Sequence, residues 1–172
     1  LLSSAAFFVA AALAMAGLSE PQARGGTTSV LADARDGLLY VVMRNASLRG
    51  LAIVIGLVNV GFGILIVALP VMIFERVHGD AALVGGLWAL LGLGSAVSVF
   101  FFGRHSSEGR ERLMVGLGTL VGAMGMAALA VTGNVIAVAA AMAVIGLANG
   151  PADIALFSMR QRRTDPAWYG RA

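Results

Sequence analysis

The sequence predicts an all-α integral membrane protein built as a polytopic helix bundle. Of its 172 residues, 59% are hydrophobic, only 12% are charged and 23 are Gly, and the mean hydropathy is +0.88. A soluble domain is roughly 25% charged and about 7% Gly, so the composition indicates a bilayer as the surrounding solvent. The chain has no Cys, which excludes disulfides, thiolate metal sites and Cys nucleophiles.

Long uncharged runs mark the expected membrane spans. A helix needs about 20 apolar residues to cross a bilayer. The run Leu113–Ala152 is 40 residues long and must fold back on itself, for which Gly133-Asn134 is the expected turn. The sequence therefore predicts five spans, placed at 1–18, 50–74, 81–103, 113–132 and 135–158. For the first run, a small-x-small pattern at 14–16 leaves a secretory signal peptide as the alternative.

The distribution of arginine predicts the orientation in the membrane. All 12 basic residues are Arg, and eleven of them fall in the segments 19–49, 104–112 and 159–172. The intervening turns hold only Arg76. Because short cytoplasmic loops are enriched in basic residues, these three segments are expected to be cytoplasmic. Apolar spans separate the arginines, so the net charge of +3 does not indicate nucleic-acid binding.

Residues 19–49 are expected to be a cytoplasmic linker that contains an interfacial amphipathic helix. Pro21 and Gly25-Gly26 indicate a loop at the start of the linker. Apolar residues then recur at helical spacing with charges between them, as is typical of a helix lying on a membrane surface. The apolar set is Val30, Leu31, Ala34, Leu38, Val41 and Val42. We expect this helix mainly to fix the start of the next span, with a regulatory role as the alternative.

Small and polar residues predict which faces of the spans contact protein or water. Lipid provides no hydrophobic driving force between helices, so small residues mark close contacts and polar residues mark protein-facing sides. Two stripes of this kind are Gly56, Asn59, Gly63 and Pro70, and Gly85, Trp88, Gly92 and Ser95. We assign helix packing to Gly118, Gly122, Gly146 and Gly150. We assign a candidate substrate path to Asn59, Trp88, Asn149 and Asp153.

The fifth span carries the only acid within a predicted span, Asp153. It shares a helical face with Met142, Gly146 and Asn149, beside the helix-interrupting Pro151. An ionised Asp at a helix centre costs about 2.5–3.5 kcal/mol on insertion scales, so it needs a partner or a wet cavity. Three interpretations remain open: an ion pair with an arginine of the loop 104–112, a proton or substrate site, and snorkelling to the cytoplasmic interface.

The sequence predicts no enzyme chemistry, metal or cofactor. Without Lys the chain cannot form a P-loop, and both His78 and His105 fall in loops. The run Gly116-x-Gly118-x-x-x-Gly122 is not preceded by a strand, as a dinucleotide fingerprint would be. Metal-ligand spacing is absent. We therefore expect no catalytic residue and a protein that is not an enzyme.

The order of these features resembles a major facilitator superfamily transporter, from the end of its sixth span to just after its tenth. The segment "LADARDGLLYVVMRNASLRGL" is similar to the start of the seventh span in bacterial efflux members, such as the enterobactin-exporter and macrolide-efflux branches. The segment "GRHSSEGRERL" resembles the second copy of the family's loop motif. Its matches are Gly103, Gly109, Arg110 and Arg112, although the motif's Asp is missing and the Gly spacing is one residue short. "GLANGPADIALFSMRQRRTDPAWYGRA" is similar to the tenth span and its exit, including Arg171.

The resemblance implies a fold of twelve spans in two halves, of which this chain is a fragment, with 50–74, 81–103 and 135–158 lining a central cavity. It implies a secondary active transporter that works by alternating access in the bacterial plasma membrane, with proton-coupled efflux as the expected activity. The implied partners are the lipid bilayer, a small-molecule substrate, H+ and the remaining spans of the same chain. A solute uptake permease of the same fold and a non-transporting membrane scaffold are the alternatives.

Overall fold

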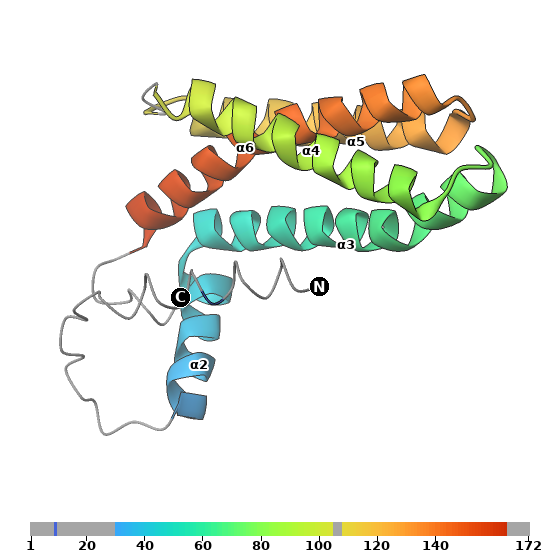
Figure 1. Ribbon diagram of the computed structural model, residues 1–172. Helices are drawn as coiled ribbons and strands as arrows, with labels where there is room; N and C mark the ends of the chain where they lie inside the picture. The colour runs from blue at the N-terminus through green and yellow to red at the C-terminus, as the bar shows by residue number, and fades with distance from the viewer. Residues whose placement is uncertain (1–8, 10–29, 105–107, 165–172) are drawn as a thin grey trace. The chain divides into compact units, whose positions relative to one another are not determined.

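The computed structural model of the chain describes residues 9, 30–104 and 108–164 (Figure 1). Most of the expected first span, the expected linker loop at 19–29, His105 and the segment 165–172 with Arg171 lie outside these ranges. The other predicted elements can be compared with the structure directly. The chain divides into two compact units, Leu1–Asp33 and Ala34–Ala172. The described elements are α2 Val30–Leu39, the π-helix η1 Tyr40–Arg44, α3 Ala46–Glu75, α4 Ala81–Phe102, α5 Glu111–Val131 and α6 Val135–Arg163.

Four of these helices, α3 to α6, are long and apolar enough to cross a bilayer. They occupy the last four predicted spans, and the long uncharged run folds back between Val131 and Val135 as expected. The boundaries differ by more than two residues at two ends, since α3 begins at Ala46 rather than 50 and α6 continues to Arg163 rather than ending at 158. The predicted all-α, polytopic membrane fold is confirmed.

Side-chain caps define where three of the spans begin. The first backbone N–H groups of a helix have no intrahelical acceptor, and an Asn or Asp side chain at the preceding position supplies one. Asn45, Asp80 and Asn134 each occupy this position. The capped N–H groups belong to Leu48, Leu83 and Ile136, at 3.1, 2.9 and 2.8 Å from the capping oxygens.

Helix α6 is the central element of the described bundle. It packs along both α4 and α5, whereas α3 contacts α4 and α6 at fewer points (Figure 1). Of the apolar stretch of α6, 44% of the residues are buried, compared with 11% for α3. Figure 1 also shows that α6 changes direction along its length. Pro151, inside α6, accounts for this bend because proline cannot donate a backbone hydrogen bond.

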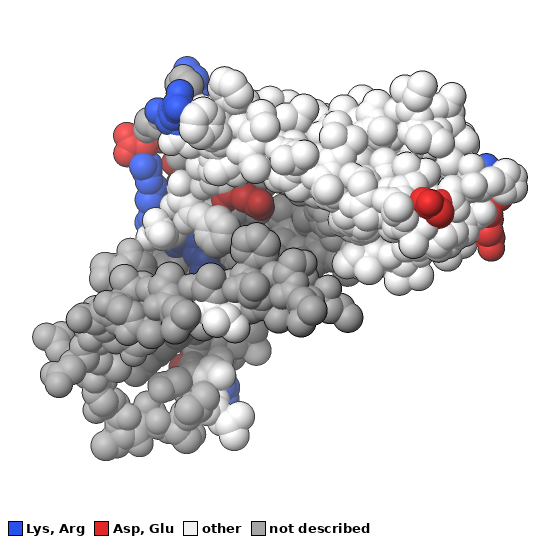
Figure 2. All heavy atoms as spheres, viewed as in Figure 1, with Lys and Arg blue, Asp and Glu red and all other residues white. Residues whose placement is uncertain are grey.

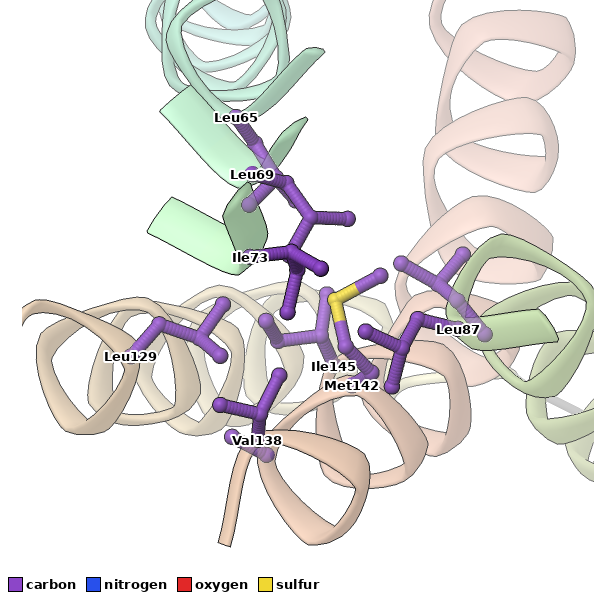
Figure 3. Packing of buried hydrophobic residues seen from close by; sticks show 10 residues of the cluster. Leu65, Leu69, Ile73, Leu87, Leu129, Val138, Met142 and Ile145 are labelled. Carbon is purple, nitrogen blue, oxygen red and sulfur yellow. The ribbon is translucent and has the colours of Figure 1, made fainter. Parts of the chain in front are cut away.

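A cluster of buried apolar side chains joins α3, α4, α5 and α6 (Figure 3). Met142 of α6 is fully buried and lies among side chains from the other helices. Lipid tails are as apolar as these side chains, so close packing and not removal from water holds such a cluster together. Its buried members are Leu65, Leu69, Ile73, Leu87, Leu91, Leu129, Val138, Ala141, Met142 and Ile145.

Two glycines allow α6 to approach α4 at backbone distance. A Cβ atom added at Gly146 would overlap the carbonyl oxygen of Leu91, and one added at Gly150 would overlap the Ser98 hydroxyl. Between the same two helices, the Ser95 hydroxyl donates a hydrogen bond of 3.1 Å to the Gly146 carbonyl oxygen. The contact therefore requires the absence of a side chain on α6 and is fixed by a polar group from α4.

The contact between α5 and α6 uses glycine in the same way. A Cβ atom at Gly118 would come within 2.8 Å of both the Ala148 carbonyl oxygen and the Ala152 Cβ, and one at Gly125 within 2.6 Å of the Ile145 side chain. Gly122 differs, because a Cβ atom there would meet nothing within 4 Å. Of the four glycines assigned to packing from the sequence, Gly118, Gly146 and Gly150 lie in tight helix contacts and Gly122 does not.

Charge is distributed unevenly over the surface of the described helices. Figure 2 shows acidic and basic side chains gathered mainly at the ends of the helices, with a broad uncharged surface between them. Large apolar side chains such as Leu57, Val67 and Leu93 are more than half exposed on the helices. Such an apolar belt is too large for a soluble monomer and fits contact with lipid or with further helices.

Replacing Gly146 by Ala is expected to destabilise the α4–α6 contact. The added methyl group meets backbone atoms of Leu91, which cannot rotate away, and overpacking of this kind costs about 1–3 kcal/mol. The thermal midpoint of the purified full-length protein in detergent, followed by intrinsic fluorescence, should fall. Gly122→Ala is the matched control, since its methyl group enters open space and Ala favours the helix. Equal falls in both variants would contradict the packing argument.

Candidate functional site

The polar candidates of α6 lie on either side of the proline. Pro151 has no amide N–H, so the carbonyl oxygen of Leu147 lacks the helical donor that it would otherwise accept from. Asn149 precedes the proline and Asp153 follows it. This part of α6 therefore brings a carbonyl oxygen without its helical bond, an amide and a carboxyl group together on neighbouring turns of one helix.

The face that carries these residues is not uniform. Met142 and Gly146, in its N-terminal part, are buried in the contact with α4 and the apolar cluster. Asn149 is half-buried and Asp153 is exposed. The four residues share a face by their spacing, but only the part beyond Asn149 is open in the described bundle.

Asp153 has no ion pair with the three arginines of the loop after α4. Within the described residues, the two ion pairs shorter than 4 Å both belong to other groups. Arg104 lies over the ring of Phe100, with its guanidinium carbon 4.0 Å from the ring centroid. Arg110 and Arg112 are exposed. The expected pairing of Asp153 with a loop arginine is thus not found in this part of the chain, and the carboxyl group faces outward.

The loop and the start of α5 are instead joined to α6 by ion pairs in which α6 supplies the base and the other two segments supply the acids. Arg162, near the end of α6, places Nη2 2.8 Å from Glu108 Oε1 and Nη1 3.3 Å from Glu111 Oε1. The Glu111 side chain is only 14% exposed, whereas that of Glu108 is 69% exposed. One guanidinium therefore bridges the loop and the first turn of α5, and its bond to Glu111 is the better shielded of the two.

The sequence did not single out these three residues. Its pattern of arginines drew attention to basic groups in the loop and to an acid in the span, whereas the structure pairs acids from the loop and α5 with a base from α6. The available signal was the alternation of Glu and Arg from Glu108 to Arg112, opposite the basic tail from Arg160. Partner choice across such a separation depends on tertiary contacts.

The two glycines of the loop motif have different structural roles. Gly109 has a φ of +73°, in the left-handed region that glycine adopts at little cost, so a side chain there would strain the turn into α5. Gly103 follows α4 with right-handed helical angles and donates its N–H to the Val99 carbonyl oxygen at 2.7 Å. A Cβ atom at Gly103 would lie 2.7 Å from that same oxygen.

Asn59 and Trp88 lie apart from the α6 candidates. The Asn59 side chain is exposed on α3 and donates a 2.9 Å hydrogen bond to the Ile55 carbonyl oxygen of its own helix. Trp88 on α4 is partly buried and packs against the apolar cluster. Asn59 is therefore available on an open face of α3, where Cβ atoms at Gly56 and Gly63 would also meet nothing within 4 Å.

A groove between α3 and α5 begins next to Asn59, at Val60, and is also lined by Gly63, but none of the four candidate path residues lines it. It has a volume of about 850 Å³ and is lined mainly by aliphatic side chains from Val60 to Met72 and by Met126, Leu129 and Ala130. Its charged residues are Glu75 and Arg76, and Arg76 donates a 3.0 Å hydrogen bond to the Ala130 carbonyl oxygen. Because none of the candidate path residues lines it, we do not assign the groove to the substrate path.

Comparison with known proteins identifies the family. A family profile described as "Major Facilitator Superfamily" matches residues 1–172. The chain belongs to the major facilitator superfamily. A curated member, "Uncharacterized MFS-type transporter y4rN" from Sinorhizobium fredii, is 35% identical over 153 residues, which cover 88% of this chain and 38% of that protein. No solved structure matches significantly.

Membership in the major facilitator superfamily makes this chain an integral membrane protein of a transport family. The chain spans well under half the length of the relative that it matches. In this major facilitator chain the described helices supply candidate polar groups on α3, α4 and α6, and the glycine contacts hold α6 against α4 and α5.

The bridge between Arg162 and Glu111 should appear as an energetic coupling. A double-mutant cycle with Arg162→Gln and Glu111→Gln is expected to give a coupling energy of up to about 1 kcal/mol, which is the upper end of the range for partly exposed ion pairs. Unfolding free energies from titrations of the purified protein with a denaturing detergent measure it. A parallel cycle of Arg162→Gln with Glu75→Gln, at the far end of α3, should be additive. Equal coupling in both cycles would rule out a specific bridge.

Proposed function

We propose that the full-length protein is a secondary active transporter that exports a small, partly apolar molecule by alternating access, in exchange for protons. Family membership supports transport across the membrane. The observation that carries the coupling is the carboxyl group of Asp153, which projects from α6 just after Pro151 without an ion pair among the described residues. A carboxyl group within a membrane helix can bind and release a proton and is a functional group by default.

The chemistry of the other candidates supports a solute that is partly apolar. Asn59, Trp88 and Asn149 offer two amides and one indole ring, with no further charge. Amides orient a ligand by hydrogen bonds, and aromatic rings contact its apolar surface. A permease for sugars or organic acids would be expected to carry more aromatic and charged side chains on these faces, so we favour export of partly apolar compounds in the bacterial plasma membrane.

The linker before α3 has a separate role in this proposal. In α2 and η1, Leu31 and Met43 are 83% and 75% exposed, and Leu38 is also mostly exposed. Apolar side chains on a helix with Arg35, Asp36 and Arg44 between them fit the interface between headgroups and acyl chains. We propose that this segment lies on the cytoplasmic membrane surface and fixes the start of α3.

The proposed orientation can be tested with single cysteines, because these 172 residues contain none. Ser47 at the start of α3 is exposed, and Gly133 in the turn before α6 has open space for a side chain. In intact cells, a membrane-impermeant maleimide should label Gly133→Cys and should reach Ser47→Cys only after the membrane is permeabilised. The reverse labelling pattern would show that the chain has the opposite orientation in the membrane. Equal labelling of both positions would contradict the four-span arrangement, which places them on opposite sides.

Asp153→Asn is expected to abolish proton exchange while the protein remains in the membrane at normal abundance. The amide keeps the size of the side chain but cannot exchange a proton at physiological pH. In everted vesicles, a panel of lipophilic solutes is added to a preformed proton gradient, and acridine orange fluorescence reports protons released by exchange. The response of the full-length wild-type protein should disappear in the variant.

Asp80→Asn is the matched control for this experiment. It removes the same charge, and Asn caps a helix as well as Asp does, so α4 should begin unchanged. Proton release should therefore persist in Asp80→Asn. A wild-type response in Asp153→Asn across the pH range would eliminate Asp153 as the coupling group and leave it as a residue that reaches the cytoplasmic interface.

A further inference from the structure

Asn45 connects the beginning of one membrane helix to the end of another. Its Oδ1 accepts a hydrogen bond of 3.1 Å from the N–H of Leu48 and so caps the start of α3. Its Nδ2 donates a hydrogen bond of 2.8 Å to the carbonyl oxygen of Arg163, the last residue of α6. The two bonded residues on α3 and α6 are separated by more than one hundred positions in the sequence.

Both bonds satisfy backbone groups that a helix cannot satisfy itself. The first N–H groups and the last C=O groups of an α-helix have no partner within it. The carboxamide of Asn has both a donor and an acceptor, so one side chain can serve the two ends together. The carboxylate of Asp offers only the acceptor when ionised, and the hydroxyl of Ser has a shorter reach. The position therefore suits Asn better than the other common N-cap residues.

The segment before Asn45 holds this residue in place. The π-helix η1 ends with a bond of 3.1 Å from the Asn45 N–H to the Tyr40 carbonyl oxygen, and Asn45 itself is extended, with φ −130° and ψ 92°. The Tyr40 hydroxyl also lies 3.4 Å from Nδ2. Wide turns of this type are rare and occur often at functional positions. Here the turn sets the side chain between the two helix ends.

The end of α6 is held from two sides. Arg163 receives the bond from Asn45 of the α3 end, and the adjacent Arg162 bridges Glu108 and Glu111 at the α5 end. The residues of α3 that belong to the apolar cluster, Leu65, Leu69 and Ile73, lie in the other half of that helix, whereas Leu48 and Leu51 are buried near the Asn45 end outside this cluster. At the Asn45 end, the carboxamide is thus a specific polar connection between α3 and α6.

We propose that Asn45 is a clasp that sets how readily the cytoplasmic ends of α3 and α6 separate. Releasing the bond to Arg163 detaches the end of α6 from α3, while Arg162 still holds it to the α5 end and the cap on Leu48 keeps α3 intact. The linker is coupled to the clasp because η1 places Asn45. This role goes beyond the proposed transport activity, since it does not depend on which solute or ion is moved.

The test separates the clasp from the cap by using two variants. Asn45→Asp keeps an acceptor of equal capping strength for Leu48 but loses the Nδ2 donor. Asn45→Ser is a neutral cap that is too short to reach Arg163. Asn134→Asp is the matched control, because Asn134 caps α6 at its other end, through the N–H of Ile136, in the same manner.

The separation is measured in the full-length protein with other cysteines removed. Spin labels are attached at Ser47→Cys and Phe157→Cys, two exposed positions near the clasp on α3 and α6, and their distance distribution is recorded by pulsed electron resonance. Both Asn45 variants should raise the ratio of separated to closed ends about 2- to 10-fold, which is the effect of one net hydrogen bond. The Asn134→Asp distribution should match that of the wild type.

Two outcomes would overturn the proposal. Unchanged distances in both Asn45 variants would show that the bond to Arg163 does not hold the ends together. A loss of helical circular dichroism in both, without a separated population, would make Asn45 a cap and nothing more. Separation with an unchanged helical signal is the expected result. Because the measured quantity is a distance, the result tests the clasp independently of whether Asp153 couples protons.

Discussion

The backbone approach of α6 to α4 is the contact on which the described bundle depends. Gly146 and Gly150 leave room for the Leu91 carbonyl and the Ser98 side chain, and the Ser95 hydroxyl bonds across the gap. In a bilayer, helices gain little from hiding apolar surface, so close packing and interhelical hydrogen bonds must supply the attraction. The contact fixes the axial position of α6. This position determines where Asp153 lies and where the end of α6 meets the neighbouring ends of α3 and α5.

Features with a one-dimensional signature could be predicted from the sequence. Uncharged length located α3 to α6, and the need for the long run to fold back placed a turn at Gly133-Asn134, where the structure has Asn134 as the cap of α6. The small-residue pattern also found Gly118 and Gly146, whose contacts are tight. Spacing does not show which neighbour a glycine will meet, however. Gly122 follows Gly118 by four residues, as Gly150 follows Gly146, yet a side chain at Gly122 would enter open space.

Features that depend on two distant segments could not be predicted in this way. Asn45 could be read only as a helix cap, since its second partner is a backbone carbonyl at the far end of the chain. Arg162 lay within a basic cluster, and nothing local selects it over its neighbours for Glu108 and Glu111. The candidate path is an intermediate case: Asn149 and Asp153 stand out by residue type and position, whereas the burial of Met142 and Gly146 on the same face depends on α4.

The bend at Pro151 makes the last part of α6 a lever arm. From Pro151 to Arg163 this arm is about 18 Å long at the usual helical rise, so a rotation of about 10° at the proline moves its tip by about 3 Å. That displacement is comparable to the length of the hydrogen bond from Asn45 and to the N–O distances of the two ion pairs of Arg162. A rotation of this size at Pro151, two residues before Asp153, would therefore be enough to make or break the contacts at the end of α6.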